Sequence, residues 1–270
     1  DTLAEKIEIQ ILAENDEIIR TLRGDNHKGV NRVIWDLRYE PTYKPYIRTT
    51  PPGRPWVQLN GEGWRPLVTW DLDLMRGQYG PKVVPDKYKV KLIVDNQEFV
   101  RELEVLKDPK SEGSIEDIKA QVETSIELRD AMNLAVNMIN TIEIVRSELD
   151  SIIPQLKNKA DIEKAQSLSK AAQSIAGSLY DIHLTGARED AFRSPMQLYG
   201  RLSALASDLS GHGIDFKPTD QQREVQAIFN KRLKVVEEKF QKFITKEVTE
   251  LNTQLKKSKL KIDTEKKIKM

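Results

Sequence analysis

The spacing of apolar residues changes once along the chain, near Asp108-Pro109, and this change constrains the fold more than any other feature. Before it, short segments alternate apolar and polar residues with a period of two, as half-buried strands do. After it, apolar residues recur every three or four positions, as in amphipathic helices. The sequence therefore predicts an α+β multidomain chain, with a β domain at residues 1–109 and a helical domain at residues 110–257.

Five segments of the first region are predicted to form strands. The turn-prone runs Glu14–Asp16 and Asp95-Asn96 separate neighbouring segments, as in antiparallel hairpins. Each segment has one polar side, which is typical of an antiparallel sheet that faces water on one side. We therefore expect an immunoglobulin-like or fibronectin-like β-sandwich. The segments are residues 6–13, 17–23, 31–38, 87–94 and 99–106.

Four apolar stripes in the second region predict helices. Ser114 and Thr219 are N-cap residues, and Pro154 and Gly211 are expected to end helices. Because each stripe must bury its apolar side against another, we expect an antiparallel four-helix bundle. The stripes contain no polar pattern typical of a buried active centre, and no pair of Glu-x-x-His motifs. They cover residues 115–152, 162–182, 195–211 and 219–255.

Composition excludes several classes of protein. The 270 residues are 39% hydrophobic, with 43 basic and 42 acidic side chains, which predicts a globular chain. No run approaches the roughly 20 apolar residues of a membrane-spanning helix. The chain has no cysteine, so it has no disulfides, thiolate zinc sites or cysteine nucleophiles. Since residues 1–5 contain neither an initiator Met nor the start of a signal peptide, we expect a piece of a longer protein.

The charge is distributed unevenly. Residues 256–270 contain seven Lys and two acidic residues, a local charge of +5, whereas residues 1–255 carry 36 basic and 40 acidic side chains, a net charge of −4. The main body therefore lacks the basic character of a nucleic-acid-binding protein. We expect residues 258–270 to form a Lys-rich, solvated tail.

Metal and cofactor sites are not expected. His27, His183 and His212 each lack a second potential ligand three or four positions away. The sequence contains neither of the common Gly-rich phosphate-binding loops. We therefore predict no metal and no cofactor.

Catalytic motifs are also not expected. The triplet Trp-Asp-Leu occurs twice, which places Asp36 and Asp71, with Asp73 nearby, in similar surroundings. Such a pair of acids suits a glycosidase if the carboxyl groups lie about 5 to 10 Å apart. The alternative is that the Trp residues face a core while the Asp residues face water. No Gly-x-Ser-x-Gly nucleophile motif occurs, and we predict no catalytic residue in this chain.

The connection at residues 39–86 is unusually long and rich in aromatic residues. It holds eight of the twelve prolines, and residues 35–88 contain nine of the seventeen aromatic residues, including every Trp. These side chains pack the loop onto its own chain, contact a protein partner, or stack on sugars. A second polar stretch, residues 184–195, joins the second and third helices. The candidate interface residues from these two segments are Tyr43, Tyr46, Trp56, Trp64, Arg188 and Arg193.

Several of these stretches resemble a known family. The matching segments are Asn31–Arg38, Thr50–Gly53 with Pro55-Trp56, Gly63–Leu72, Val105–Pro109, Gly186–Pro195 and residues 198–207. Together they are similar to the C-terminal region of large bacterial BNR-repeat, sortilin-like β-propeller proteins, which are often labelled glycosyl hydrolases. The resemblance covers most of residues 5–255. It implies an Ig-like sandwich followed by helices, appended to a β-propeller of an exported protein in the periplasm or on the cell surface.

The resemblance places any catalytic site on the propeller, so the hydrolase label transfers to no residue of this chain. We therefore expect a non-catalytic accessory module that supports propeller docking or binds another protein. One alternative is a carbohydrate-binding accessory region of a glycoside hydrolase. A third hypothesis is a hydrolase that uses Asp36, Asp71 or Asp73. The expected partners are the propeller of the same protein, another protein or a glycan, and not nucleic acid.

Overall fold

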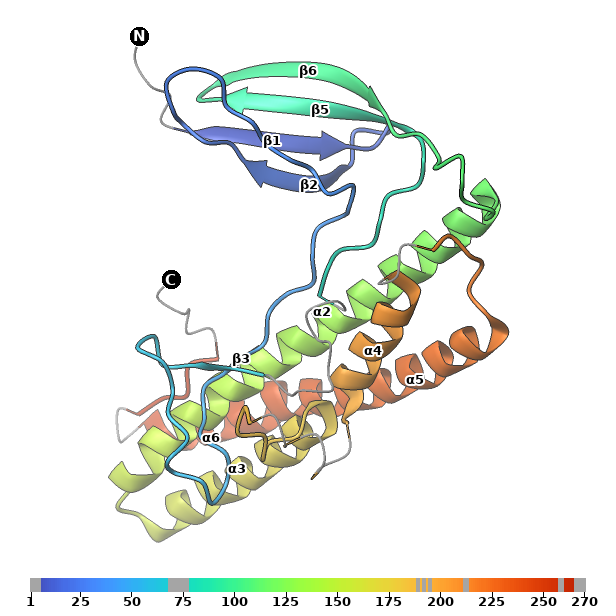
Figure 1. Cartoon of the computed structure of the whole chain (residues 1–270). Helices are drawn as coiled ribbons and strands as arrows, with labels where there is room; N and C mark the ends of the chain where they lie inside the picture. Colours follow the sequence, from blue (N-terminus) through green and yellow to red (C-terminus); the bar gives the residue numbers. More distant parts are fainter. Residues whose placement is uncertain are drawn as a thin grey trace.

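The computed structural model describes residues 6–67, 78–187, 190, 193, 196–210, 214–256 and 260–264. It has a small antiparallel sheet in the N-terminal region and four helical segments after it (Figure 1). The α+β class and the order of the two regions are therefore as predicted. The sheet stands beyond the N-terminal end of the long helix α2 (Ile115–Ile152), and connecting segments lead from the sheet down to the helices.

The main sheet has four strands in the order β2-β1-β5-β6, and every neighbouring pair is antiparallel. Asp16 and Asp95 have positive φ angles of 67° and 52° in the turns of the two hairpins, a conformation that Asp tolerates better than most residues. Four of the five predicted strands are confirmed, with ends shifted by at most two residues. They are β1 (Ile7–Leu12), β2 (Ile18–Arg23), β5 (Lys87–Val94) and β6 (Gln97–Glu104).

The predicted strand at Asn31–Arg38 is wrong. Arg38 forms one isolated bridge with Lys82, and the rest of the segment is irregular. Trp35 instead covers the sheet: its ring meets that of Tyr88 edge to face at 5.7 Å, and its Nε1 donates to the carbonyl of Arg38 at 2.9 Å. Leu37 has a φ of 57°, which breaks an extended backbone. The alternating apolar residues of this segment therefore reflect packing and not the hydrogen bonding of a strand.

The sheet has one charged face and one apolar face. Lys91 of β5 forms an ion pair with Glu98 of β6 at 2.8 Å on the charged face. On the other face, Ile11, Ile19, Tyr88 and Val83 form a small core. All eight residues of β6 are exposed. No second sheet packs on this face among the described strands, and the sandwich stays a prediction.

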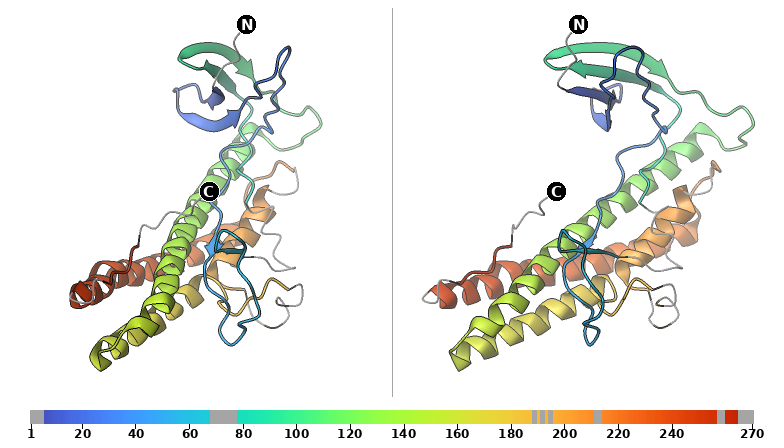
Figure 2. Two further views of the ribbon diagram at one scale, coloured as in Figure 1. Left: turned by 90° about the vertical axis from the view of Figure 1, so that its left-hand side faces the viewer. Right: turned by 60° about the vertical axis from the view of Figure 1, so that its left-hand side comes forward.

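The four predicted helical segments are all present. Ser114 and Thr219 cap α2 (Ile115–Ile152) and α5 (Asp220–Lys242) with complete capping boxes. Between them lie α3 (Lys159–Leu179), which turns back along α2 after the short 3-10 turn Ile153–Gln155, and α4 (Leu198–Ser210) (Figure 2). Ser194 and Pro195, where the third helix was expected to begin, lie outside the described residues, but α4 begins only at Leu198, after the non-helical residues Met196 and Gln197. The buried sides of these helices form one continuous apolar core.

The fourth helical segment changes geometry near its end. A π-helical stretch, Phe243–Val248, follows α5 and leads into α6 (Thr249–Leu255). Phe243 and Val248 are five residues apart and both buried. Five residues exceed one α-helical turn, so the wider π turn keeps both side chains on the core side.

The Lys-rich tail is not wholly solvated. Ile262 is buried in the helical core, and its backbone N–H and carbonyl bond to the side chain of Asn252 at 2.7 and 3.0 Å. The expectation of a solvated tail is therefore wrong for Ile262, because this apolar side chain packs on the core between Lys-rich positions.

Candidate functional site

The long aromatic-rich loop is bonded to α2 by side chains of that helix. Asn133 Oδ1 accepts from the N–H of Tyr43 at 2.8 Å, and Asn140 Oδ1 accepts from the N–H of Tyr46 at 2.8 Å. Asn140 also donates to the carbonyl of Lys44 at 3.1 Å. The loop therefore docks on its own chain, which was one of the three alternatives for it. The two-stranded ribbon of β3 (Tyr46–Ile47) and β4 (Arg65–Pro66) forms at this place.

The carboxylate of Glu143 is the centre of this docking. Its Oε2 accepts from the backbone N–H groups of Arg48 and Thr49 at 2.8 and 3.1 Å and from the Thr49 hydroxyl at 3.0 Å. Its Oε1 accepts from Arg146 Nη1 at 2.5 Å and from the Tyr180 hydroxyl at 2.6 Å. One carboxylate thus joins the loop, α2 and the residue that follows α3.

The Glu143 cluster is closed to solvent. Glu143 has 0% of its surface exposed, and Arg146, Tyr180 and Thr49 are also buried. Burial and the neighbouring Glu143 carboxylate raise the pKa of the Tyr180 hydroxyl well above its usual value. Burial alone would lower the pKa of Arg146, but the Glu143 carboxylate outweighs it and the pKa is raised. The arrangement holds Arg146 and Glu143 as a charged pair with Tyr180 as a neutral donor.

Sequence reasoning missed this buried polar cluster. A local signal exists. From Ile142 to Arg146, α2 is buried on every side, and Ile142, Ile144 and Val145 are apolar. Charged residues inside a turn that is apolar all round have to be buried with partners. The partners themselves come from distant positions, so the spacing along α2 does not identify them.

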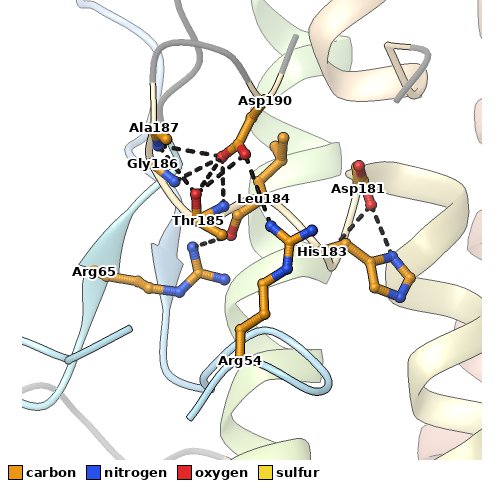
Figure 3. A network of polar contacts seen from close by, with 9 residues as sticks. All are labelled: Arg54, Arg65, Asp181, His183, Leu184, Thr185, Gly186, Ala187 and Asp190. Atoms are coloured by element: carbon orange, nitrogen blue, oxygen red, sulfur yellow. Dashed lines mark hydrogen bonds and ion pairs between the residues drawn. The ribbon is translucent and has the colours of Figure 1, made fainter. Parts of the chain in front are cut away.

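A second polar cluster joins the long loop to the stretch that follows α3 (Figure 3). The Asp190 carboxylate accepts from the N–H groups of Thr185, Gly186 and Ala187 at 2.5 to 3.2 Å. Arg54 Nη1, from the long loop, lies 3.9 Å from Asp190 Oδ1. Gly186 has a φ of 85°, a conformation that glycine adopts without strain, so the three N–H groups can converge on one carboxylate.

Arg65 makes the second link between these loops. It is buried, and its Nε and Nη1 donate to the carbonyls of Thr49 and Leu184 at 3.0 and 2.8 Å. Burial lowers the pKa of this guanidinium, although the electrostatic influence of Tyr180 and Glu143 acts to raise it. The guanidinium beside Asp190 is that of Arg54 and not that of the candidate interface residue Arg193. Arg193 is exposed and its backbone N–H donates to the Asp190 carbonyl, whereas Arg188 lies outside the described residues.

The predicted aromatic interface residues differ in exposure. Trp56 is 70% exposed, and Tyr43 is also exposed. Trp64 and Tyr46 are half-buried and contact each other edge to face at 4.8 Å, while Trp64 Nε1 donates to Glu62 at 2.7 Å. Of these four, Trp56 and Tyr43 are thus the more available to a partner.

The acid and histidine candidates are scattered where the structure describes them. Asp36 is exposed, and Asp71, Asp73 and His212 lie outside the described residues. His183 Nδ1 lies 3.1 Å from Asp181 Oδ1. Within the described ranges, no three His, Asp or Glu residues come together in a way that could hold a metal ion. In the same part of the chain, no helix has an apolar stretch long enough to cross a membrane.

Comparisons of the chain with family models, with curated proteins and with solved structures each found no match. The resemblance to the C-terminal region of sortilin-like propeller proteins therefore stays a prediction.

Proposed function

We propose that this chain is a non-catalytic accessory module of an exported bacterial β-propeller protein, and that it docks on the propeller through the apolar face of its sheet. The observation that carries the proposal is the exposure of β6 on that face. Phe99 pairs directly with Leu92, which in turn pairs with Ile9. Directly opposed residues of neighbouring strands lie on the same side of a sheet. Along this row the apolar face continues across three strands to the exposed edge, where Gln97 and Arg101 flank Phe99 on the same side.

Cover on the apolar face is uneven among the described residues. Trp35, Tyr39 and Val83 pack at the end near Tyr88. At the other end, Phe99 is 49% exposed. Leu103, which lies opposite Tyr88 on the edge strand β6, is also exposed. An apolar sheet face that is open on one side is typical of a surface covered by another layer or partner. The propeller of the proposed parent protein would be joined to the chain before β1, beside this face.

The finer fold belongs to the same proposal. The four-stranded sheet would be one layer of an Ig-like or fibronectin-like sandwich. The helices would form the antiparallel four-helix bundle expected from their stripes. Their shared apolar core supports this arrangement. The hydrogen bonds from Glu143, Asn133 and Asn140 hold the long loop against α2 and would keep the two regions together during docking.

The test uses two neighbouring residues of β6. Phe99→Glu adds a charge to the apolar face, and Val100→Glu adds the same charge to the opposite face at a position of similar exposure, 47%. Binding of the separately produced propeller region to this chain is measured by sedimentation velocity. We expect roughly tenfold or greater weakening for Phe99→Glu and little change for Val100→Glu. Equal binding by both variants, or no association of the unmodified chain, would contradict the proposal.

A carbohydrate-binding accessory function is the second candidate, and the exposed indole of Trp56 favours it. Exposed Trp rings provide flat apolar surfaces on which sugars can stack. Affinity electrophoresis in gels that contain soluble polysaccharides tests this function. Retardation that Trp56→Ala removes would support it, while equal mobility in all gels would count against it. In that experiment Phe99→Glu serves as the control variant, because it alters a different surface.

A further inference from the structure

A hollow of about 630 Å³ lies between the end of α3, the first turn of α4 and the middle of α5. It is separate from the Glu143 and Asp190 clusters and from the sheet. Ser178 lines it from α3, while Leu198 and Arg201 line it from α4. Its volume lies in the range of roughly 300–1,000 Å³ that is typical of small-molecule pockets in proteins.

The floor of the hollow is apolar and open to solvent. Ile228 and Val235 of α5 line it and are 51% and 47% exposed. They are seven residues apart, or two helical turns, so they lie on the same side of α5. The buried stripe of the same helix, Phe229, Leu233 and Val236, already packs on the core. Ile228 and Val235 thus form a second apolar surface on this helix.

Every charged side chain in the lining is positive. Arg201, Lys231 and Arg232 all belong to it, and it includes no Asp or Glu. No ion pair within the described part of the chain engages any of the three. Lys231 and Arg232 come from the turn between Ile228 and Val235, so the positive charge lies directly beside the apolar floor. The positive end of the α4 dipole, at Leu198, lies in the same wall.

We propose that this hollow binds a small anionic amphiphile: an aliphatic chain on Ile228 and Val235, and a carboxylate, sulfate or phosphate head beside Lys231, Arg232 and Arg201. The charge of the lining is complementary to such a head group. A symmetric contact with a second copy would instead bring the Lys231 and Arg232 side chains of both copies together. A docked helix would need a longer groove, since the α5 positions in the lining span only residues 228–236, about 12 Å.

The inference is independent of the proposed docking function, because neither β6 nor the long loop contributes to the hollow. Binding of dodecanoate to the whole chain is measured by isothermal titration below the critical micelle concentration. Dodecyltrimethylammonium, with an equally long chain and a positive head, is the charge control. We expect saturable one-to-one binding of dodecanoate and at least roughly tenfold weaker binding of the cationic amphiphile.

Two double variants locate the site. Lys231→Glu with Arg232→Glu reverses both charges in the lining and is expected to weaken dodecanoate binding roughly tenfold or more. Lys234→Glu with Lys239→Glu makes the same charge change at exposed positions of α5 outside the lining and should leave binding unchanged. Equal affinity for the two amphiphiles, equal loss in both double variants, or no binding of dodecanoate would overturn the proposal. Binding of an acidic amphipathic peptide in place of dodecanoate would also overturn it, in favour of a protein partner.

Discussion

The hydroxyl of Tyr180, the residue that follows α3, donates to the carboxylate of Glu143 in α2 across 2.6 Å, although 37 positions separate the two residues. The same carboxylate binds two backbone N–H groups of the long loop, at Arg48 and Thr49. A single buried acid thus connects three parts of the chain that have no local reason to meet.

Glu143→Gln is expected to destabilise the protein strongly. The amide keeps the size of the side chain but leaves the Arg146 guanidinium buried without its counter-charge, which typically costs about 3–5 kcal/mol. The free energy of unfolding, measured by urea denaturation, reports the change. Glu123→Gln, at an exposed position of the same helix, is the control and should change it by less than about 0.5 kcal/mol. Similar losses in both variants would contradict the assigned role of Glu143.

Asn140→Ala should loosen the long loop while the helices stay folded. The substitution removes an acceptor for the Tyr46 N–H and a donor to the Lys44 carbonyl, each bond worth about 1 kcal/mol. We expect hydrogen exchange at the Tyr46 amide to accelerate about tenfold or more. Asn137→Ala provides a matched comparison, because Asn137 is an exposed residue of the same helix. If Tyr46 exchanges at the same rate in both variants, the loop is held by other contacts.

Gly80→Ala should disrupt the connection between the sheet and the helices. A methyl group at this position would lie 2.0 Å from the carbonyl oxygen of Tyr39 and 2.7 Å from that of Glu40. Backbone atoms cannot yield as a flexible side chain does, so we expect a loss of about 2 kcal/mol or more in unfolding free energy. At Gly61, by contrast, an added methyl group meets nothing within 4 Å, and Gly61→Ala should be nearly neutral by the same thermal or urea measurement.

Stability should fall at alkaline pH, in part through Tyr199. Burial raises the pKa of its hydroxyl from about 10 to about 12, with the bond from Gln78 acting in the opposite direction. Below pH 10 both folded and unfolded states keep the proton. Between pH 10 and 12 only the unfolded state loses it, so the free energy of unfolding decreases with pH by up to about 1.4 kcal/mol per unit.

Tyr199→Phe removes this titration. Urea denaturation between pH 9 and 11.5 should therefore show a shallower alkaline decline for the variant than for the unmodified chain. Absorbance of tyrosinate at increasing pH gives an independent readout of the same ionisation. An identical pH slope in both proteins would mean that Tyr199 does not contribute to the alkaline loss.

The sequence predicted most of the secondary structure because the signals for it are local. Ser114 and Thr219 have their capping partners three residues away, and Asp95-Asn96 forms a turn within one hairpin. The π-helical turn was not predicted, although the five-residue spacing of Phe243 and Val248 is a local signal for it. The strand predicted at Asn31–Arg38 is wrong because alternation alone does not show whether a neighbouring strand is available. Here Trp35 packs over the sheet instead.

The polar clusters were beyond such reasoning because their partners are remote. Glu143 bonds to residues 94 and 95 positions earlier, and Arg65 bonds to a carbonyl 119 positions later. The length and proline content of residues 39–86 predicted a docked or functional loop, but not the side chains of α2 that hold it. In the same way, Arg54 and not Arg193 is the guanidinium beside Asp190, since proximity along the chain does not decide proximity in space.

The paired segments around Arg38 and Lys82 connect the sheet to the helices, and the N–H of Tyr43 donates to Asn133 of α2. A pull on the sheet would run along these segments toward Asn133, Asn140 and Glu143. Their hydrogen bonds would then share the tension at several points along α2. This attachment would let the module resist mechanical force at its N-terminal end without peeling the loop from the helix one bond at a time.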